Sequence, residues 1–179
     1  MNNNLTLNNK VIFKVYGAYQ WNELATDHSQ KKNECTLKAI NSLIGQVKTR
    51  TKDFPVDIRY NRLRATAGSF LLEGIRERII KSNALIFDIT GFNANVMFEL
   101  GIAIEASREI NNGAKIYIIC EGNDYKKANI PSDLAGYFVS LYEIKGGKAV
   151  FHDSNSLAMR LVSEIADMTN VAYIETDEK

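Results

Sequence analysis

A single glutamate, Glu99, lies where a polar loop gives way to an apolar helix. The stretch TGFNANVMFELGIAIEA (90–106) is polar at its start and has helical apolar spacing at its end. If Asn93 or Asn95 caps this helix, Glu99 lies in its first turn or just beyond it. The helix dipole and the backbone N–H groups of a first turn favour an ionised carboxylate. Such a group at the edge of a pocket can attack an anomeric carbon or stabilise an oxocarbenium ion.

The same residue types also have structural explanations. The dipole stabilises a first-turn glutamate by ~0.3–1 kcal/mol without any ligand. Asp88 can cap the turn that follows its strand. The arginines within 59–64 can form a solvated face, Tyr16 and Trp21 can be packing residues, and Gly17 can simply end a strand. Taken alone, position along the chain leaves both explanations open.

The elements that must position these residues alternate between strand and helix. Runs rich in β-branched and aromatic residues predict strands at 10–17, 55–60, 83–90 and 114–120, and one more within 130–144. Helical spacing predicts helices at 34–50, within 90–106, at 69–82 and at 154–170. KGGK (145–148) predicts a hairpin turn. In the 69–82 helix the residues expected to face the core are Leu72, Ile75, Ile79 and Ile80.

This alternation predicts a three-layer α/β fold with an about five-stranded, mostly parallel sheet and helices on both faces, as in flavodoxin-like proteins. Ligands bind such sheets at the carboxyl ends of the strands. The loops after Tyr16, Tyr60, Asp88 and Cys120 should therefore share one edge of the sheet, which we call the rim. The candidate ligand-binding residues there are Tyr16, Gly17, Tyr19, Trp21, Arg59, Asn61, Arg62, Arg64, Asp88, Thr90, Asn93, Asn95, Glu121, Asn123 and Asp124.

The side chains of the predicted rim favour a nucleoside-like ligand. Aromatic residues beside a glycine suit a flat ring, and carboxylates and asparagines suit the hydroxyls of a sugar. Arginines bind phosphate or carboxylate through paired hydrogen bonds. The sequence therefore predicts a site for a base, a sugar and, where one is present, an anionic group.

Composition narrows the class of protein. The 179 residues predict one domain, 10–170, with a disordered lead at 1–9 and an acidic tail at 171–179. A formal net charge of +1 gives no reason to expect a nucleic acid or a membrane surface as partner. The start of the chain does not resemble a signal peptide, and two cysteines are too few for a disulfide framework, so a cytoplasmic protein with reduced thiols is expected. His28 and His152 have no partner at ligand spacing, so no metal is expected.

A resemblance adds to this interpretation. SNALIFDITGFNANVMFELGIAIEA (82–106) resembles the core signature of the nucleoside 2-deoxyribosyltransferase-like superfamily, and is similar to TIR-like nucleotide-binding domains of bacterial defence proteins. In those families a buried strand ends in an acid, a polar loop follows, and a helix opens with Asn-Val, an aromatic residue and Glu-Leu-Gly. The matching residues are Asp88, Asn93, Asn95, Val96, Phe98, Glu99, Leu100, Gly101 and Ala103. A second segment, 130–143, resembles TIR-like proteins more weakly.

The resemblance implies a flavodoxin-like or TIR-like fold and an enzyme that cleaves the N-glycosidic bond of a nucleoside, nucleotide or NAD. In the transferases the motif glutamate takes the sugar from its base, and in TIR enzymes a helix glutamate assists cleavage of the nicotinamide–ribose bond. Either role would fall on Glu99. Asp88 would help to hold the ligand, with Tyr16 and Gly17 contributing from the loop after the first strand.

The resemblance also bears on ligands and partners. No cofactor is implied, and NAD would be a substrate. A phosphate would have to be bound by Arg59, Arg62 or Arg64, because the loop after the first strand has only one glycine. Relatives in both families act as oligomers, so a homo-oligomer is expected.

Two other functions are compatible with the same residues. One is a non-catalytic TIR-like sensor or signalling module, for example in bacterial defence, that binds a nucleotide without turning it over. The other is a structural protein of the same fold. Base release separates the enzyme from both, and ligand binding separates the sensor from the structural protein.

Overall fold

The structure is a computed structural model that describes residues 10–20, 27–63, 71–109, 114–124, 128, 130–134, 136–146, 148–152 and 154–171. The predicted lead at 1–9 and the predicted tail beyond Val171 lie outside the described residues, as do Trp21 and Arg64. Within the described ranges, no helix is both long enough and apolar enough to cross a membrane.

Strands and helices alternate along the described chain. In order, the elements are β1 (Val11–Ala18), α1 (Asp27–Arg50), β2 (Val56–Arg62), α2 (Leu71–Ile80), β3 (Ala84–Asp88), the 3-10 turn η1 (Thr90–Phe92), α3 (Ala94–Glu109), β4 (Lys115–Glu121), the 3-10 turn η2 (Ser132–Leu134), β5 (Val139–Lys145), β6 (Lys148–Phe151) and α4 (Ser154–Thr169). Together the strands form a six-stranded sheet in the order β2-β1-β3-β4-β5-β6.

The strand order defines where the chain reverses direction across the sheet. β1 pairs in parallel with β2 on one side and with β3 on the other, and β4 and β5 continue the parallel sheet. The 2-1-3-4-5 order is that of flavodoxin-like folds, which bind ligands at the switch point between β1 and β3. The structure therefore confirms the predicted three-layer α/β class.

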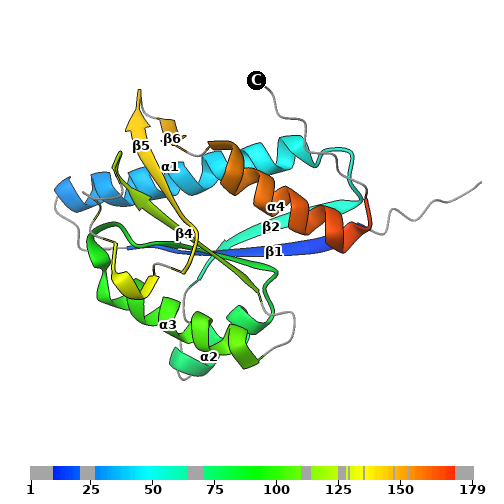
Figure 1. The fold of residues 1–179 in the computed structure, drawn as a ribbon, viewed down its shortest axis with the longest axis horizontal. Coiled ribbons are helices and arrows are strands. Elements are labelled where there is room, and N and C mark those ends of the chain that lie inside the picture. The colour runs from blue at the N-terminus through cyan, green and yellow to red at the C-terminus, as the bar shows by residue number, and fades with distance from the viewer. Residues whose placement is uncertain are drawn as a thin grey trace, which may run out of the picture.

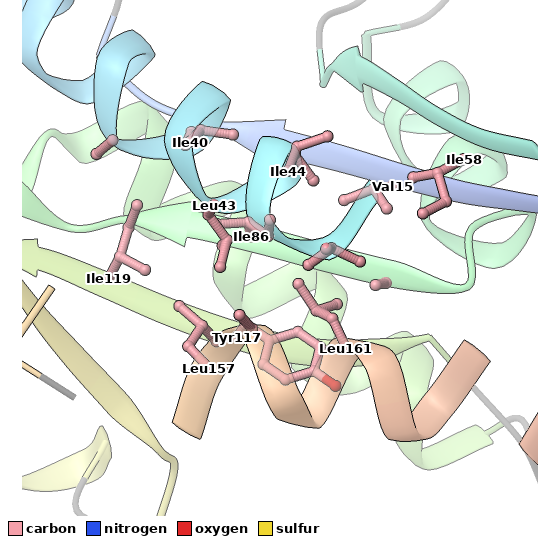
Figure 2. Packing of buried hydrophobic residues seen from close by; sticks show 14 of the residues in the cluster. Val15, Ile40, Leu43, Ile44, Ile58, Ile86, Tyr117, Ile119, Leu157 and Leu161 are labelled. Atoms are coloured by element: carbon pink, nitrogen blue, oxygen red, sulfur yellow. The ribbon is translucent and has the colours of Figure 1, made fainter. Parts of the chain in front are cut away.

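Helices cover both faces of the sheet. Figure 1 shows α1 and α4 on one side of the strands and α2 and α3 on the other. Figure 2 shows the core under α1 and α4, where Ile40, Leu43 and Leu161 point toward strand residues such as Ile86 and Ile119. A second core lies under α2 and α3 and includes Leu85, Phe87 and Leu100. β3 is buried along its whole length because both layers cover it.

Three expectations need correction. The sheet has six described strands because the predicted hairpin at 145–148 adds β6 antiparallel to β5. α1 begins at Asp27, seven residues before the predicted start, because apolar spacing marks only the later part of the helix. Of the four residues expected to face the core from α2, only Ile75 and Ile79 are buried, whereas Leu72 and Ile80 are 50% and 42% exposed. Ile80 is turned about 100° around the helix from Ile79, and Leu72 lies in the first turn, at the exposed end of the stripe.

Candidate functional site

The carboxyl ends of β1, β2, β3 and β4 form the rim. Backbone hydrogen bonds connect neighbouring strands there: the Leu63 N–H donates to the Gly17 carbonyl at 2.8 Å, and the Ile89 N–H donates to the Ile119 carbonyl at 3.0 Å. The Glu121 N–H donates to the Thr90 hydroxyl oxygen at 2.8 Å, which connects the end of β4 to the loop after β3. The rim is thus held together by the backbone as well as by packing.

The loop between β3 and α3 fixes the start of the helix. Gly91 and Phe92 both have left-handed backbone angles, with φ of 72° and 51°. A positive φ is ordinary for glycine but uncommon for phenylalanine. After this turn the Asn93 side-chain oxygen accepts from the N–H groups of Asn95 and Val96 at 3.0 and 3.3 Å. Asn93 is therefore the N-cap of α3.

Because α3 begins at Ala94, Glu99 is its sixth residue and lies in the second turn. The helix dipole fades beyond the first turn, so it does not explain the position of this carboxyl group. Glu99 is partly buried. Burial raises the pKa of the Glu99 carboxyl from 4.5 to about 7, while the Arg62 guanidinium acts to lower it. The expectation that the helix dipole keeps this group ionised is therefore wrong: desolvation favours the protonated form, and the charge of Arg62 offsets it only in part.

Arg62, at the end of β2, belongs to a group of aromatic and charged side chains. Its guanidinium carbon lies 5.0 Å from the centre of the Tyr19 ring, a distance typical of a cation–π contact. Tyr60 lies two residues before Arg62 on the same strand, and its ring leans over Gly17 of β1. A Cβ atom on Gly17 would lie 2.5 Å from the Tyr60 hydroxyl oxygen. Only a glycine leaves room for this ring.

The Tyr60 hydroxyl is buried and makes no hydrogen bond to any residue in the described ranges. Its pKa is raised above the ordinary value, first by burial and then by the neighbouring Tyr19, with Arg62 acting in the opposite direction. The hydroxyl is therefore neutral at physiological pH and available as a donor. Arg62 influences both Tyr60 and Glu99, so these three residues lie in one electrostatic neighbourhood.

Asp88, at the end of β3, lies in a different environment. It is 3% exposed. One carboxylate oxygen, Oδ2, accepts from the hydroxyl groups of Thr36 and Tyr142, each at 2.6 Å. The other, Oδ1, accepts from the Thr90 N–H at 2.8 Å. Both oxygens thus have donors from the protein, and the carboxylate holds α1 and β5 to the end of β3.

The structure brings some of the other predicted site residues to the rim and uses others elsewhere. Both the backbone N–H and the hydroxyl of Thr90 make hydrogen bonds within the rim. Tyr16 packs against the core beneath α2 and α3, and Asn95 is exposed in the first turn of α3. Arg59 lies in the middle of β2, away from the rim, and its Nε donates to Asp57 at 2.7 Å. The positions of Trp21 and Arg64 fall outside the described residues.

Three residues of the site were not predicted from the sequence. Thr36 and Tyr142 come from α1 and β5 and meet Asp88 through the tertiary fold alone. Tyr60 was predicted only to end a strand. The one signal that could have identified it is an aromatic residue on one strand with a glycine on its neighbour, since the two meet diagonally when the strands pair.

The fold and the position of the rim define a flavodoxin-like α/β protein with its candidate site at the switch point. No protein-family model matches the chain, and no curated protein is significantly similar to it in sequence. Among the described residues, no cluster of three or more His, Cys, Asp or Glu side chains could hold a metal ion.

Proposed function

We propose that the protein cleaves the N-glycosidic bond of a nucleoside, nucleotide or NAD, and that Glu99 is the nucleophile or the stabiliser of the oxocarbenium ion. The observation that supports this most is the partly buried Glu99 carboxyl group near Arg62, with a pKa of about 7. Carboxyl groups with strongly raised pKa values concentrate at functional sites. The resemblance of residues 82–106 to deoxyribosyltransferase-like and TIR-like proteins supports the same role.

The chemistry requires a carboxylate beside the C1′ atom of a ribose. As nucleophile, the Glu99 oxygen forms a bond to C1′ while the C1′–N bond breaks, and the base leaves with the bonding electrons. The base of an ordinary nucleoside or nucleotide then takes up a proton, whereas the cationic nicotinamide of NAD leaves as a neutral molecule. Water or a second base then attacks C1′ and releases Glu99. Only the ionised carboxylate can begin this sequence, so the rate is expected to rise with pH through about 7.

Release of free base, measured by chromatography, tests this proposal. The protein is incubated with NAD and a panel of nucleosides and nucleotides between pH 5.5 and 8.5. Glu99→Gln keeps the shape of the side chain and removes its charge. Glu105→Gln is the matched control, because Glu105 is an exposed glutamate on the same helix. Base release that is lost in Glu99→Gln and kept in Glu105→Gln supports the proposal, whereas release unaffected by Glu99→Gln contradicts it.

A non-catalytic sensor is the second candidate, and one observation favours it. The Asp88 carboxylate already accepts hydrogen bonds from three groups of the protein. Because both of its oxygens already accept hydrogen bonds from the protein, Asp88 is not available to hold a reacting ribose as the resemblance to the enzymes implies, and this favours binding without turnover. Tight binding of one compound without release of its base would favour the sensor.

A further inference from the structure

The Tyr60 hydroxyl is a buried donor without an acceptor among the described residues. Buried polar groups in folded proteins nearly always have hydrogen-bond partners, and an exception calls for an explanation such as a functional role. A phenylalanine at this position would fill the same space without the unpaired hydroxyl. The unpaired hydroxyl therefore lowers the stability of the protein without a ligand. This indicates that its role is to form a hydrogen bond with a bound molecule.

The surroundings of the hydroxyl indicate what kind of group would accept from it. Its raised pKa keeps it protonated, and the nearby Arg62 guanidinium carries only donors. Two donors side by side suit an oxygen of an anionic group, and a planar guanidinium binds phosphate with particular strength. The guanidinium carbon of Arg62 lies over the Tyr19 ring, 5.0 Å from its centre.

The main chain of β1 leaves room for the Tyr60 hydroxyl beside Arg62. Gly17 of β1 lies under the Tyr60 ring, and any larger residue there would meet the hydroxyl oxygen at 2.5 Å. Gly17 pairs directly with Arg62 across the two strands. The absence of a side chain at Gly17 therefore allows the Tyr60 hydroxyl to lie close to Arg62, at the carboxyl ends of β1 and β2.

We propose that Tyr60 and Arg62 form a phosphate-binding subsite, so that the ligand of the rim is a nucleotide rather than a free nucleoside. The phosphate subsite itself does not depend on the proposed function. Only the position of the ribose, between the subsite and Glu99, rests on it. Because Arg62 acts electrostatically on both Tyr60 and Glu99, a ligand whose phosphate binds at this subsite brings its ribose toward the Glu99 carboxyl group.

The test is calorimetric binding of NAD and of four nucleoside 5′-monophosphates, each monophosphate compared with its own nucleoside at constant ionic strength. We expect at least one monophosphate to bind about tenfold or more tightly than its nucleoside, as one hydrogen bond to a charged group predicts. Tyr60→Phe should weaken the monophosphate by about tenfold and leave the nucleoside unchanged. Gly17→Ala should act in the same direction, because its methyl group displaces the hydroxyl.

Tyr117→Phe is the matched control, since Tyr117 lies on β4 and points toward α4 (Figure 2), on a different strand from Tyr60. Tyr60→Phe removes only an unpaired hydroxyl, so it should melt at or above the temperature of the unmodified protein. No monophosphate binding, equal affinity for every pair, or a preference that survives Tyr60→Phe would overturn the subsite.

Base release measured on the same samples separates the two proposals. A Tyr60-dependent phosphate preference without base release leaves the subsite standing and refutes the enzyme. Base release from nucleosides, with no preference for their phosphates, refutes the subsite and supports the enzyme.

Discussion

Replacing Glu99 by glutamine should make the protein more stable at alkaline pH. The folded state holds the Glu99 proton up to a pH of about 7, whereas the unfolded chain releases it near 4.5. Between these values the folded state binds more protons, so its stability falls as the pH rises through this range and levels off above it. Each tenfold difference in proton affinity is worth about 1.4 kcal/mol. Ionising Glu99 therefore costs roughly 2–3 kcal/mol between pH 5 and pH 8.5.

Urea unfolding of the original protein and of Glu99→Gln at pH 5 and pH 8.5 measures this cost. The quantity of interest is the change with pH of the stability difference between the two proteins, because groups that titrate in both cancel. We expect glutamine to gain roughly 2–3 kcal/mol relative to glutamate between the two pH values, or roughly 5–10 °C in melting temperature for a chain of this size. Glu105→Gln should change by less than about 0.5 kcal/mol, as exposed substitutions usually do.

A stability difference that does not vary with pH would refute the reasoning, because it would mean that water reaches the carboxyl group and its pKa is close to 4.5. A difference that varies in the opposite direction would mean that the charge of Arg62 outweighs desolvation. In either case the argument for Glu99 as a tuned acid would fail, even if ligand binding were found.

Two further substitutions test the buried polar groups. Tyr142→Phe removes a donor at 2.6 Å from Asp88 and should destabilise the fold by about 1.5–3 kcal/mol, as measured by urea unfolding; a loss below about 0.5 kcal/mol would show that Asp88 is hydrated in solution. Ser140→Ala should instead stabilise the fold by about 1 kcal/mol, because the Ser140 hydroxyl is fully buried on β5 without a hydrogen bond to any described residue. A loss of stability in that variant would mean that the hydroxyl has a partner in solution.

The layers of this fold could be predicted from sequence because each strand carries its own local signal. β3 reads ALIFD and is buried at every position, as a strand covered on both faces requires. Asn93 was one of two residues expected to cap α3, and it does. By contrast, the apolar residues of α2 did not show which of them face the core, since four of them fit a helical stripe and only two are buried.

The site was harder to predict because its contacts are distant in sequence. Thr36 and Tyr142 lie 52 and 54 residues from Asp88, and no local pattern marks a hydroxyl that will meet a carboxylate from another element. The pKa of Glu99 depends on how deeply the second turn of α3 is covered, and the sequence suggested only that the helix dipole would act. Charge and spacing alone therefore placed Glu99 near the rim but predicted a carboxylate kept ionised by the helix dipole, whereas burial favours the protonated form.

The Asp57–Arg59 ion pair has a consequence for how copies of the protein could associate. It lies on β2, which is one outer strand of the sheet, and both side chains are about half exposed. The other outer strand, β6, has four residues and begins with a lysine. Charged side chains and short outer strands discourage one sheet from adding to another. If the chain forms the homo-oligomer expected from its sequence, its subunits should join through helices or loops, with each sheet ending at its own outer strands.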